Sequence, residues 1–192
     1  MITDLLEKHI VDTIKEWQIK IGFMPGNMKL YYPAESLKHL LGIPETDTDG
    51  ELMEALNRFC ERKQGLFGRI LVSCDAAGER YCLDIPAKGT EYIATKVPAP
   101  EFLSSFLQMI TKPGNTMEDV RSCFQTFAQK HGIQYREEDL EEEGLGHTFS
   151  FEENEIESYI YCIEEDAFGL TYHRFDEMDY KKMREEGHHH HE

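Results

Sequence analysis

The sequence of 192 residues lacks the cysteine patterns of a disulfide framework or a structural zinc site. Its five cysteines are odd in number and include no CxxC pair. We therefore expect free thiols and a cytoplasmic location, because cysteines stay reduced in that compartment. No apolar run approaches the roughly 20 residues that span a membrane, and the first residues are acidic and amphipathic. We expect neither a membrane protein nor a secreted one.

Positive charge is scarce. Lys and Arg total 20 against 37 Asp and Glu, which gives a formal net charge of -17. Residues 1–97 hold 12 basic and 15 acidic side chains (net -3), and residues 98–192 hold 8 and 22 (net -14). Such a chain repels phosphate backbones and anionic membranes. We therefore expect a basic protein partner, and neither nucleic acid nor a membrane; the sequence does not set the oligomeric state.

Catalytic and cofactor-binding signatures are also absent. The sequence contains no HExxH helix, no GxSxG turn and no Walker A lysine loop, and Gly144-Leu145-Gly146 lacks the third glycine of a dinucleotide turn. Carboxylates are so abundant that no pair stands out as an acid and a base. We therefore expect no catalytic residues, no cofactor and no metal, and the balance is against an enzyme.

What the sequence does contain is periodic hydrophobicity. Apolar side chains recur every three or four positions along residues 3–21, which predicts an amphipathic helix. Thr48 and Glu51 form a capping box, which predicts the start of another helix. Two alternating stretches predict a hairpin whose even-residue turn keeps Cys74 and Cys82 apart. The buried face of the first helix would hold Leu6, Ile10, Ile14, Trp17 and Ile21. The elements expected in residues 1–97 are helices over 3–21, 33–41 and 48–63 and strands over 28–32, 69–75, 80–85 and 90–97.

Two prolines, Pro98 and Pro100, interrupt both helix and strand, so we place a domain boundary there. Beyond it we expect an acidic α+β subdomain over 98–187, in which a helix pair packs on an antiparallel β-sheet. Asn115, followed by Glu118, is the expected N-cap of the second helix. Residues 188–192 are a His-rich tail, either a cloning remnant or a native metal-binding tract. The expected strands cover 133–138, 147–153, 156–163 and 170–175, with an acidic loop over 137–143 and a last helix over 176–186.

The order of elements in residues 3–85 is helix, strand, helix, helix, strand, strand. The stretch Tyr32–Ile43 resembles the second helix of a winged helix-turn-helix domain. In that family the helix after the turn lies in the DNA major groove and the hairpin contacts the backbone. The resemblance implies contacts from residues 49–63 and 75–80. The cationic side chains available there are Arg58, Arg62, Lys63 and Arg80.

Carboxylates dominate the start of this third helix, at Asp47, Asp49, Glu51 and Glu54. They would repel DNA, so we expect residues 1–97 to be a winged-helix-like subdomain that contacts protein. The whole chain also resembles an uncharacterised bacterial family known only as a domain of unknown function, which implies no activity. The α+β fold class follows from both halves together.

A metal or hydrolytic site in the second half is the remaining alternative. It would need His147 and His173 close together, with Glu152 or Glu157 completing the ligand set. The full group of candidate side chains is His147, Glu152, Glu153, Glu157, Tyr172, His173 and Arg174. The favoured function is a protein-interaction or structural module. The two alternatives are a DNA-binding winged-helix regulator and a metal-dependent hydrolase that uses the C-terminal half.

Overall fold

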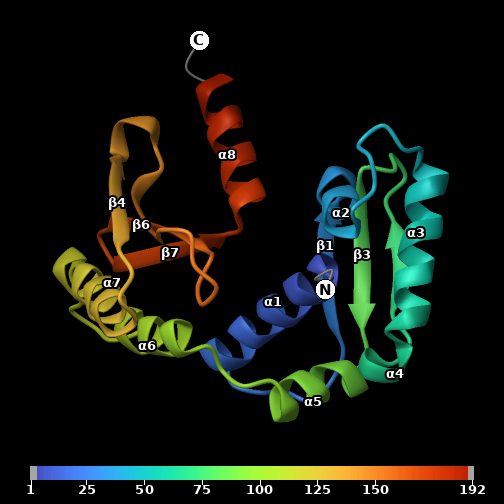
Figure 1. Cartoon of the computed structure of the whole chain (residues 1–192), viewed down its shortest axis with the longest axis horizontal. Helices are drawn as coiled ribbons and strands as arrows, with labels where there is room; N and C mark the ends of the chain where they lie inside the picture. Colours follow the sequence, from blue (N-terminus) through green and yellow to red (C-terminus); the bar gives the residue numbers. More distant parts are fainter. Residues whose placement is uncertain (1–3, 190–192) are drawn as a thin grey trace. The chain divides into compact units, whose positions relative to one another are not determined.

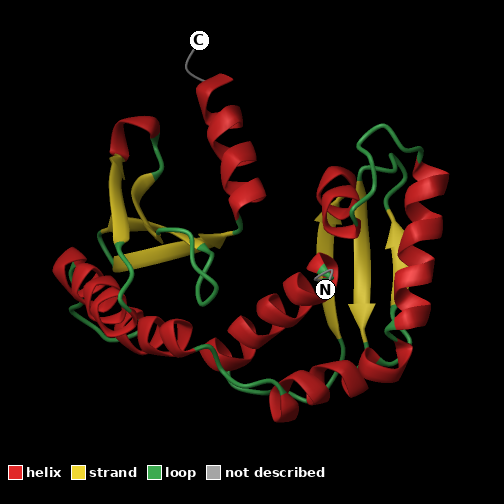
Figure 2. Ribbon diagram, in the orientation of Figure 1, coloured by secondary structure: helices red, strands yellow, loops and turns green. Residues whose placement is uncertain are grey.

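The structure is a computed structural model that describes residues 4–189. The chain forms two compact units, Met1–Ala99 (unit 1) and Pro100–Glu192 (unit 2). Helices and two antiparallel sheets together make an α+β fold, as expected (Figures 1 and 2). Among residues 4–189, no helix is both long and apolar enough to cross a membrane.

Unit 1 contains five helices and a three-stranded antiparallel sheet of order β1-β3-β2 among its described residues. One face of this sheet packs against α1, α2 and α3 through a core that includes Leu6, Leu37, Phe59 and Leu83. Burying each such side chain contributes about 1.5–3 kcal/mol. The elements are α1 (Leu5–Ile21), β1 (Met28–Pro33), α2 (Ala34–Leu41), α3 (Asp49–Arg62), α4 (Gln64–Phe67), β2 (Leu71–Cys74), β3 (Arg80–Ile85) and α5 (Ala87–Lys96).

Local signals place most of these boundaries. The Thr48 hydroxyl accepts the Glu51 backbone N–H at 3.2 Å, which caps α3 as its capping box predicts. Gly42 ends α2 in the left-handed conformation, at φ 70°. In the hairpin, Cys82 lies opposite Ser73, which confirms the even-residue register, and all five cysteines are free.

The expected strand over 90–97 is wrong, because residues 90–96 belong to α5 and Val97 is its C-cap residue. Thr90, Ile93 and Val97 suggested a strand by their branching, but Thr90 and Ile93 are spaced to share one buried helical face. Gly89 permits the close packing of this helix: a Cβ there would lie 2.8 Å from the Phe67 carbonyl oxygen. Tertiary packing thus overrides the local strand preference.

The first helix also differs in one respect from the expected pattern. Leu6, Ile10 and Ile14 are fully buried, but Trp17 is 46% exposed and Ile21 is exposed as well. The Lys20 ammonium lies over the Trp17 ring, 5.5 Å from its centroid. The fully buried face of α1 therefore ends nearly two turns before the helix does.

Unit 2 packs the pair α6 and α7 on a four-stranded antiparallel sheet of order β4-β5-β6-β7, as expected. The contact is aromatic: the Phe124 ring stacks on Phe149 at 5.0 Å, and Phe106 meets Tyr172 edge-on at 5.1 Å. The elements are α6 (Glu101–Ile110), α7 (Met117–His131), β4 (Tyr135–Leu140), the 3-10 turn η1 (Glu141–Glu143), β5 (Gly146–Phe151), β6 (Ile160–Asp166), β7 (Gly169–Phe175) and α8 (Glu177–His189).

Two details of unit 2 correct the sequence-based expectation. Thr116 caps α7 through a capping box with Asp119, whereas Asn115 donates to the Ile110 carbonyl at the end of α6. The acidic run is mostly strand and turn, because buried Leu140 anchors β4 and η1 follows it. The α8 backbone continues through His189, and the rest of the expected His-rich tail lies outside the described residues.

Candidate functional site

The turn between β2 and β3 lies against the start of α3. A Cβ added to Gly78, whose φ is +71°, would lie 3.2 Å from a carboxylate oxygen of Asp49. Burial raises the pKa of nearby Tyr81, and Cys74, Asp49 and Asp75 raise it further. We call the four exposed carboxylates of this region the acidic end of unit 1. They are Asp49, Glu51, Asp75 and Glu79.

The cationic side chains that sequence analysis singled out do not gather at this end. Lys63 donates to Glu7 at 2.8 Å and also pairs with Asp4 at 3.4 Å. Arg62 lies 3.9 Å from the same Asp4 carboxylate. Both side chains thus join the C-terminal end of α3 to the N-terminal end of α1, and the hydrogen bond to Glu7 raises the pKa of Lys63.

Arg58 and Arg80 have other neighbours. Arg58 lies 3.7 Å from Glu54 one turn earlier on α3, and both side chains are largely exposed. The Arg80 guanidinium sits over the exposed ring of Tyr31 on β1, 5.5 Å from its centroid. The four cations therefore form no single patch.

A groove runs between α3 and β2. Its volume is about 590 Å³, and Leu71 contributes an exposed apolar side chain to it. Met53, which also lines the groove, lies one helical turn beyond Asp49. Met53 is thus the lining residue of α3 nearest in sequence to the acidic end, whose four carboxylates do not line the groove. Its other lining residues are Asn57, Cys60, Glu61, Gln64, Arg69, Ile70 and Val72.

The metal set expected from the sequence of the second half does not form. His147 pairs with Ile163 on β6, whereas His173 pairs with the adjacent Cys162. Neighbouring strand residues point to opposite faces, so the two histidines lie on opposite faces of the sheet.

The other candidate side chains of unit 2 have structural surroundings. Glu152 accepts the Gln134 backbone N–H at 3.1 Å, and buried Glu157 accepts that of Tyr159 at 3.2 Å. Tyr172 belongs to the aromatic core. Arg174 stacks over Tyr159, 4.0 Å from the ring centroid. Glu153 and His173 do not join them in a cluster of metal-ligating side chains among the residues searched, 4–189.

His147 instead lies beside two carboxylates that the sequence analysis did not select. Its Nε2 atom is 3.9 Å from Asp139, and its Nδ1 atom is 3.5 Å from Glu141. Asp139 is the direct cross-strand partner of His147. The sequence analysis missed this pair because it ended the predicted strand at residue 138. The observed β4 ends at Leu140, and this longer strand places Asp139 opposite His147.

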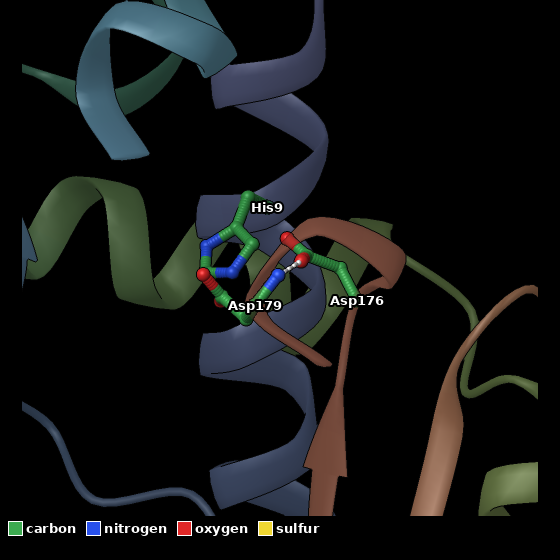
Figure 3. A group of neighbouring side chains, drawn as sticks. All are labelled: His9, Asp176 and Asp179. Carbon is green, nitrogen blue, oxygen red and sulfur yellow. Dashed lines mark hydrogen bonds between the residues drawn. The ribbon is translucent and has the colours of Figure 1, made fainter. Parts of the chain in front are cut away.

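Other polar side chains have clear roles within their own units. His9 on α1 forms a hydrogen bond with the Tyr32 hydroxyl at 2.9 Å, which fixes α1 against β1. Asp176 accepts the Asp179 backbone N–H at 2.8 Å and so caps the start of α8 (Figure 3).

Comparison with protein families found one described as "Domain of unknown function, E. rectale Gene description (DUF3877)", which matches residues 3–184. The match includes elements of both units, from α1 to α8. Comparisons with curated proteins and with solved structures found no match.

Proposed function

Because the chain belongs to the DUF3877 family, whose description names no activity, we propose its function from its surface. It is a cytoplasmic protein-interaction module that binds a basic partner protein through the acidic end of unit 1. Unit 1 resembles a winged-helix domain. The surface that contacts DNA in that family binds a protein partner in this chain. The element order α1-β1-α2-α3-α4-β2-β3, in which α4 is a single short turn, and the strand order β1-β3-β2 support this resemblance.

The approach of the β2–β3 turn to Asp49 carries the proposal. It brings carboxylates from the helix start and from the hairpin to the place where a DNA-binding winged helix would meet phosphates. Like charges repel there, so a phosphate backbone is disfavoured and a Lys- or Arg-rich surface is favoured.

The positions of the cations support the same conclusion. Lys63 and Arg62 lie against Asp4 and Glu7 of the same unit, so a DNA contact would have to compete with these pairs. The groove beside α3 offers apolar surface at exposed Leu71, and its lining begins at Met53, one helical turn from Asp49. A partner that inserts an apolar side chain between basic ones matches this combination.

A binding comparison tests the proposal. Fluorescence anisotropy would follow a labelled peptide of alternating Lys and Leu, and separately a duplex DNA, with the full-length protein at low salt. We expect saturable peptide binding and no DNA binding. Glu51→Gln combined with Glu79→Gln should weaken peptide binding at least about 10-fold. Both carboxylates are exposed, and the local capping bonds use the side chains of Thr48 and Asp75, which accept the backbone N–H groups of Glu51 and Glu79.

The matched control removes the same two charges from unit 2, by Glu142→Gln and Glu155→Gln. It should change peptide affinity less than about twofold. Equal weakening in both double variants would contradict the proposal, because it would mean that net charge alone attracts the peptide. A DNA complex that weakens steeply with salt would contradict it as well.

A further inference from the structure

The end of β4, the turn η1 and the start of β5 bring together three side chains of metal-ligating type. They are Asp139, Glu141 and His147, and one ligand atom from each lies within 4.8 Å of the others. We propose that they bind one Zn²⁺ ion. The site belongs to unit 2 and is independent of the partner surface on unit 1.

His147 is the fixed member of the site. Its side chain is 16% exposed, and its Nδ1 atom is buried without a hydrogen bond among the described residues. A buried ring nitrogen in this state has lost water and gained no donor or acceptor. A neutral imidazole nitrogen is a preferred ligand of Zn²⁺, so a bound ion would satisfy it.

The backbone around His147 is held in place by its neighbour. Gly146 has φ +68°, and a Cβ there would lie 2.3 Å from the Ile163 carbonyl oxygen. No larger residue fits this close approach of β5 to β6. The start of β5 is therefore a rigid base for the imidazole.

The carboxylates are the adjustable members. The side chains of Asp139 and Glu141 are 63% and 68% exposed, and they flank different nitrogens of the ring. Ligand atoms about 2.1 Å from a tetrahedral ion are roughly 3.4 Å apart. The 3.5 Å between Glu141 and Nδ1 is close to this value, whereas the 3.9 Å between Asp139 and Nε2 involves the other ring nitrogen, which cannot bind the same ion. Rotation of the exposed Asp139 side chain would bring its carboxylate to an ion on Nδ1, since one ligand atom of each residue already lies within 4.8 Å of the others.

One hydrogen bond already orients this pair. The Glu141 backbone N–H donates to Oδ1 of Asp139 at 3.0 Å, which leaves Oδ2 directed toward His147. Such outer contacts orient metal ligands in known sites. The donor set of one imidazole and two carboxylates suits Zn²⁺, with its fourth position left to water.

The charge of the region favours a cation. Residues 137–143 contain six carboxylates, and Arg184 pairs with two of them, Glu138 and Glu143. A divalent ion at Asp139 and Glu141 would relieve repulsion along this segment. It would also tie η1 to β5, so we expect the ion to stabilise unit 2 against unfolding.

The test uses the full-length chain with His188 to His191 each replaced by glutamine, because four adjacent imidazoles would bind the probe themselves. Calorimetric titration with ZnCl₂ should give saturable binding, and Co²⁺ absorption should report an N/O-ligated ion. Asp139→Asn and Glu141→Gln should each weaken Zn²⁺ binding at least about 10-fold. Zn²⁺ should also raise the unfolding temperature of the parent chain and not of these variants.

Glu142→Gln is the matched control, since it removes a carboxylate from the same turn without removing a proposed ligand. It should change the affinity less than about twofold. His147→Asn should abolish binding, but Asp139 and Glu141 decide the test, because their side chains are exposed and the amide oxygen introduced by Asp139→Asn can still accept the Glu141 backbone N–H. Absence of saturable binding at millimolar Zn²⁺ would overturn the proposal. Equal weakening by Glu142→Gln, or unchanged affinity in Asp139→Asn and Glu141→Gln, would overturn it too.

Discussion

At the scale of single residues, Lys63 shows how a surface cation can be a structural one. Its side chain is 21% exposed and lies between Glu7 and Asp4, so it links two helices that are distant in sequence. Arg58 on the same helix is 62% exposed and pairs with the similarly exposed Glu54. The two residues look alike in the sequence and differ in what surrounds them.

We expect Lys63→Met to lower the free energy of unfolding by about 1 kcal/mol, because it leaves two partly buried carboxylates without their closest cation. Arg58→Met should cost less than about 0.5 kcal/mol. Urea denaturation of both variants measures the difference. A larger loss for Arg58→Met would show that this structural interpretation of Lys63 is wrong.

The same comparison has a pH dependence. Since Glu7 raises the pKa of Lys63 in the folded state, the stabilisation is fully present below the ordinary pKa of 10.5. It is lost as pH rises through the higher, folded-state pKa. The gap between the native chain and Lys63→Met should therefore shrink in strongly alkaline solution.

At the scale of elements, sequence periodicity predicted most of the fold. It succeeded where one pattern dominated, as in α1, where apolar residues recur at helical spacing and Asp4 caps the start. It failed at residues 90–97, because branched side chains favour strands locally and the packing of Gly89 against Phe67 is a long-range contact. No local pattern records such a contact.

The candidate sites were less predictable than the fold. The sequence predicted the acidity of the α3 start, but the approach of Gly78 to Asp49 depends on the tertiary fold. His147 was selected with the wrong companions, because its neighbours depend on strand register. A strand ending at residue 138 leaves Asp139 out, whereas the observed β4 places it directly opposite.

Two helical glycines provide a test of element packing. Ala normally stabilises a helix relative to Gly by about 1 kcal/mol. At Gly89 the new Cβ would lie 2.8 Å from both the Phe67 carbonyl oxygen and an Ile85 methyl group, so we expect Gly89→Ala to destabilise by about 1–3 kcal/mol. Gly50 in α3 has its nearest such neighbour at 3.8 Å, so Gly50→Ala should be neutral or stabilising.

Thermal or urea unfolding of the two alanine variants gives opposite signs if this packing is correct. A stabilising Gly89→Ala would mean that α5 does not approach α4 as closely as the structure has it.

At the scale of the whole molecule, the two units differ in core and in charge. The core cluster of unit 1 runs from Leu6 to Ile93 and contains residues of that unit alone, whereas the core of unit 2 is built mainly from aromatic rings. The unit boundary lies beside Pro98 and Pro100, which interrupt regular hydrogen bonding. These features indicate that each unit has what a domain needs to fold separately.

We therefore expect a fragment of residues 1–99 to unfold cooperatively and to keep the far-ultraviolet circular dichroism of a mixed α/β protein. Nuclear magnetic resonance of this fragment should give dispersed amide signals. A fragment with collapsed dispersion would mean that unit 1 depends on residues of unit 2.

The position of the only tryptophan has a practical consequence for such measurements. Trp17 lies on α1, while the aromatic core of unit 2 is made of phenylalanine and tyrosine. Fluorescence excited at 295 nm therefore comes from Trp17 and monitors unit 1 alone. The Trp17 indole is 46% exposed in the folded protein. Its emission maximum should therefore already lie at a long wavelength in the folded state and shift little on denaturation. Quenching of Trp17 fluorescence by iodide or acrylamide is therefore a better measure of whether α1 is folded than the shift of its emission wavelength.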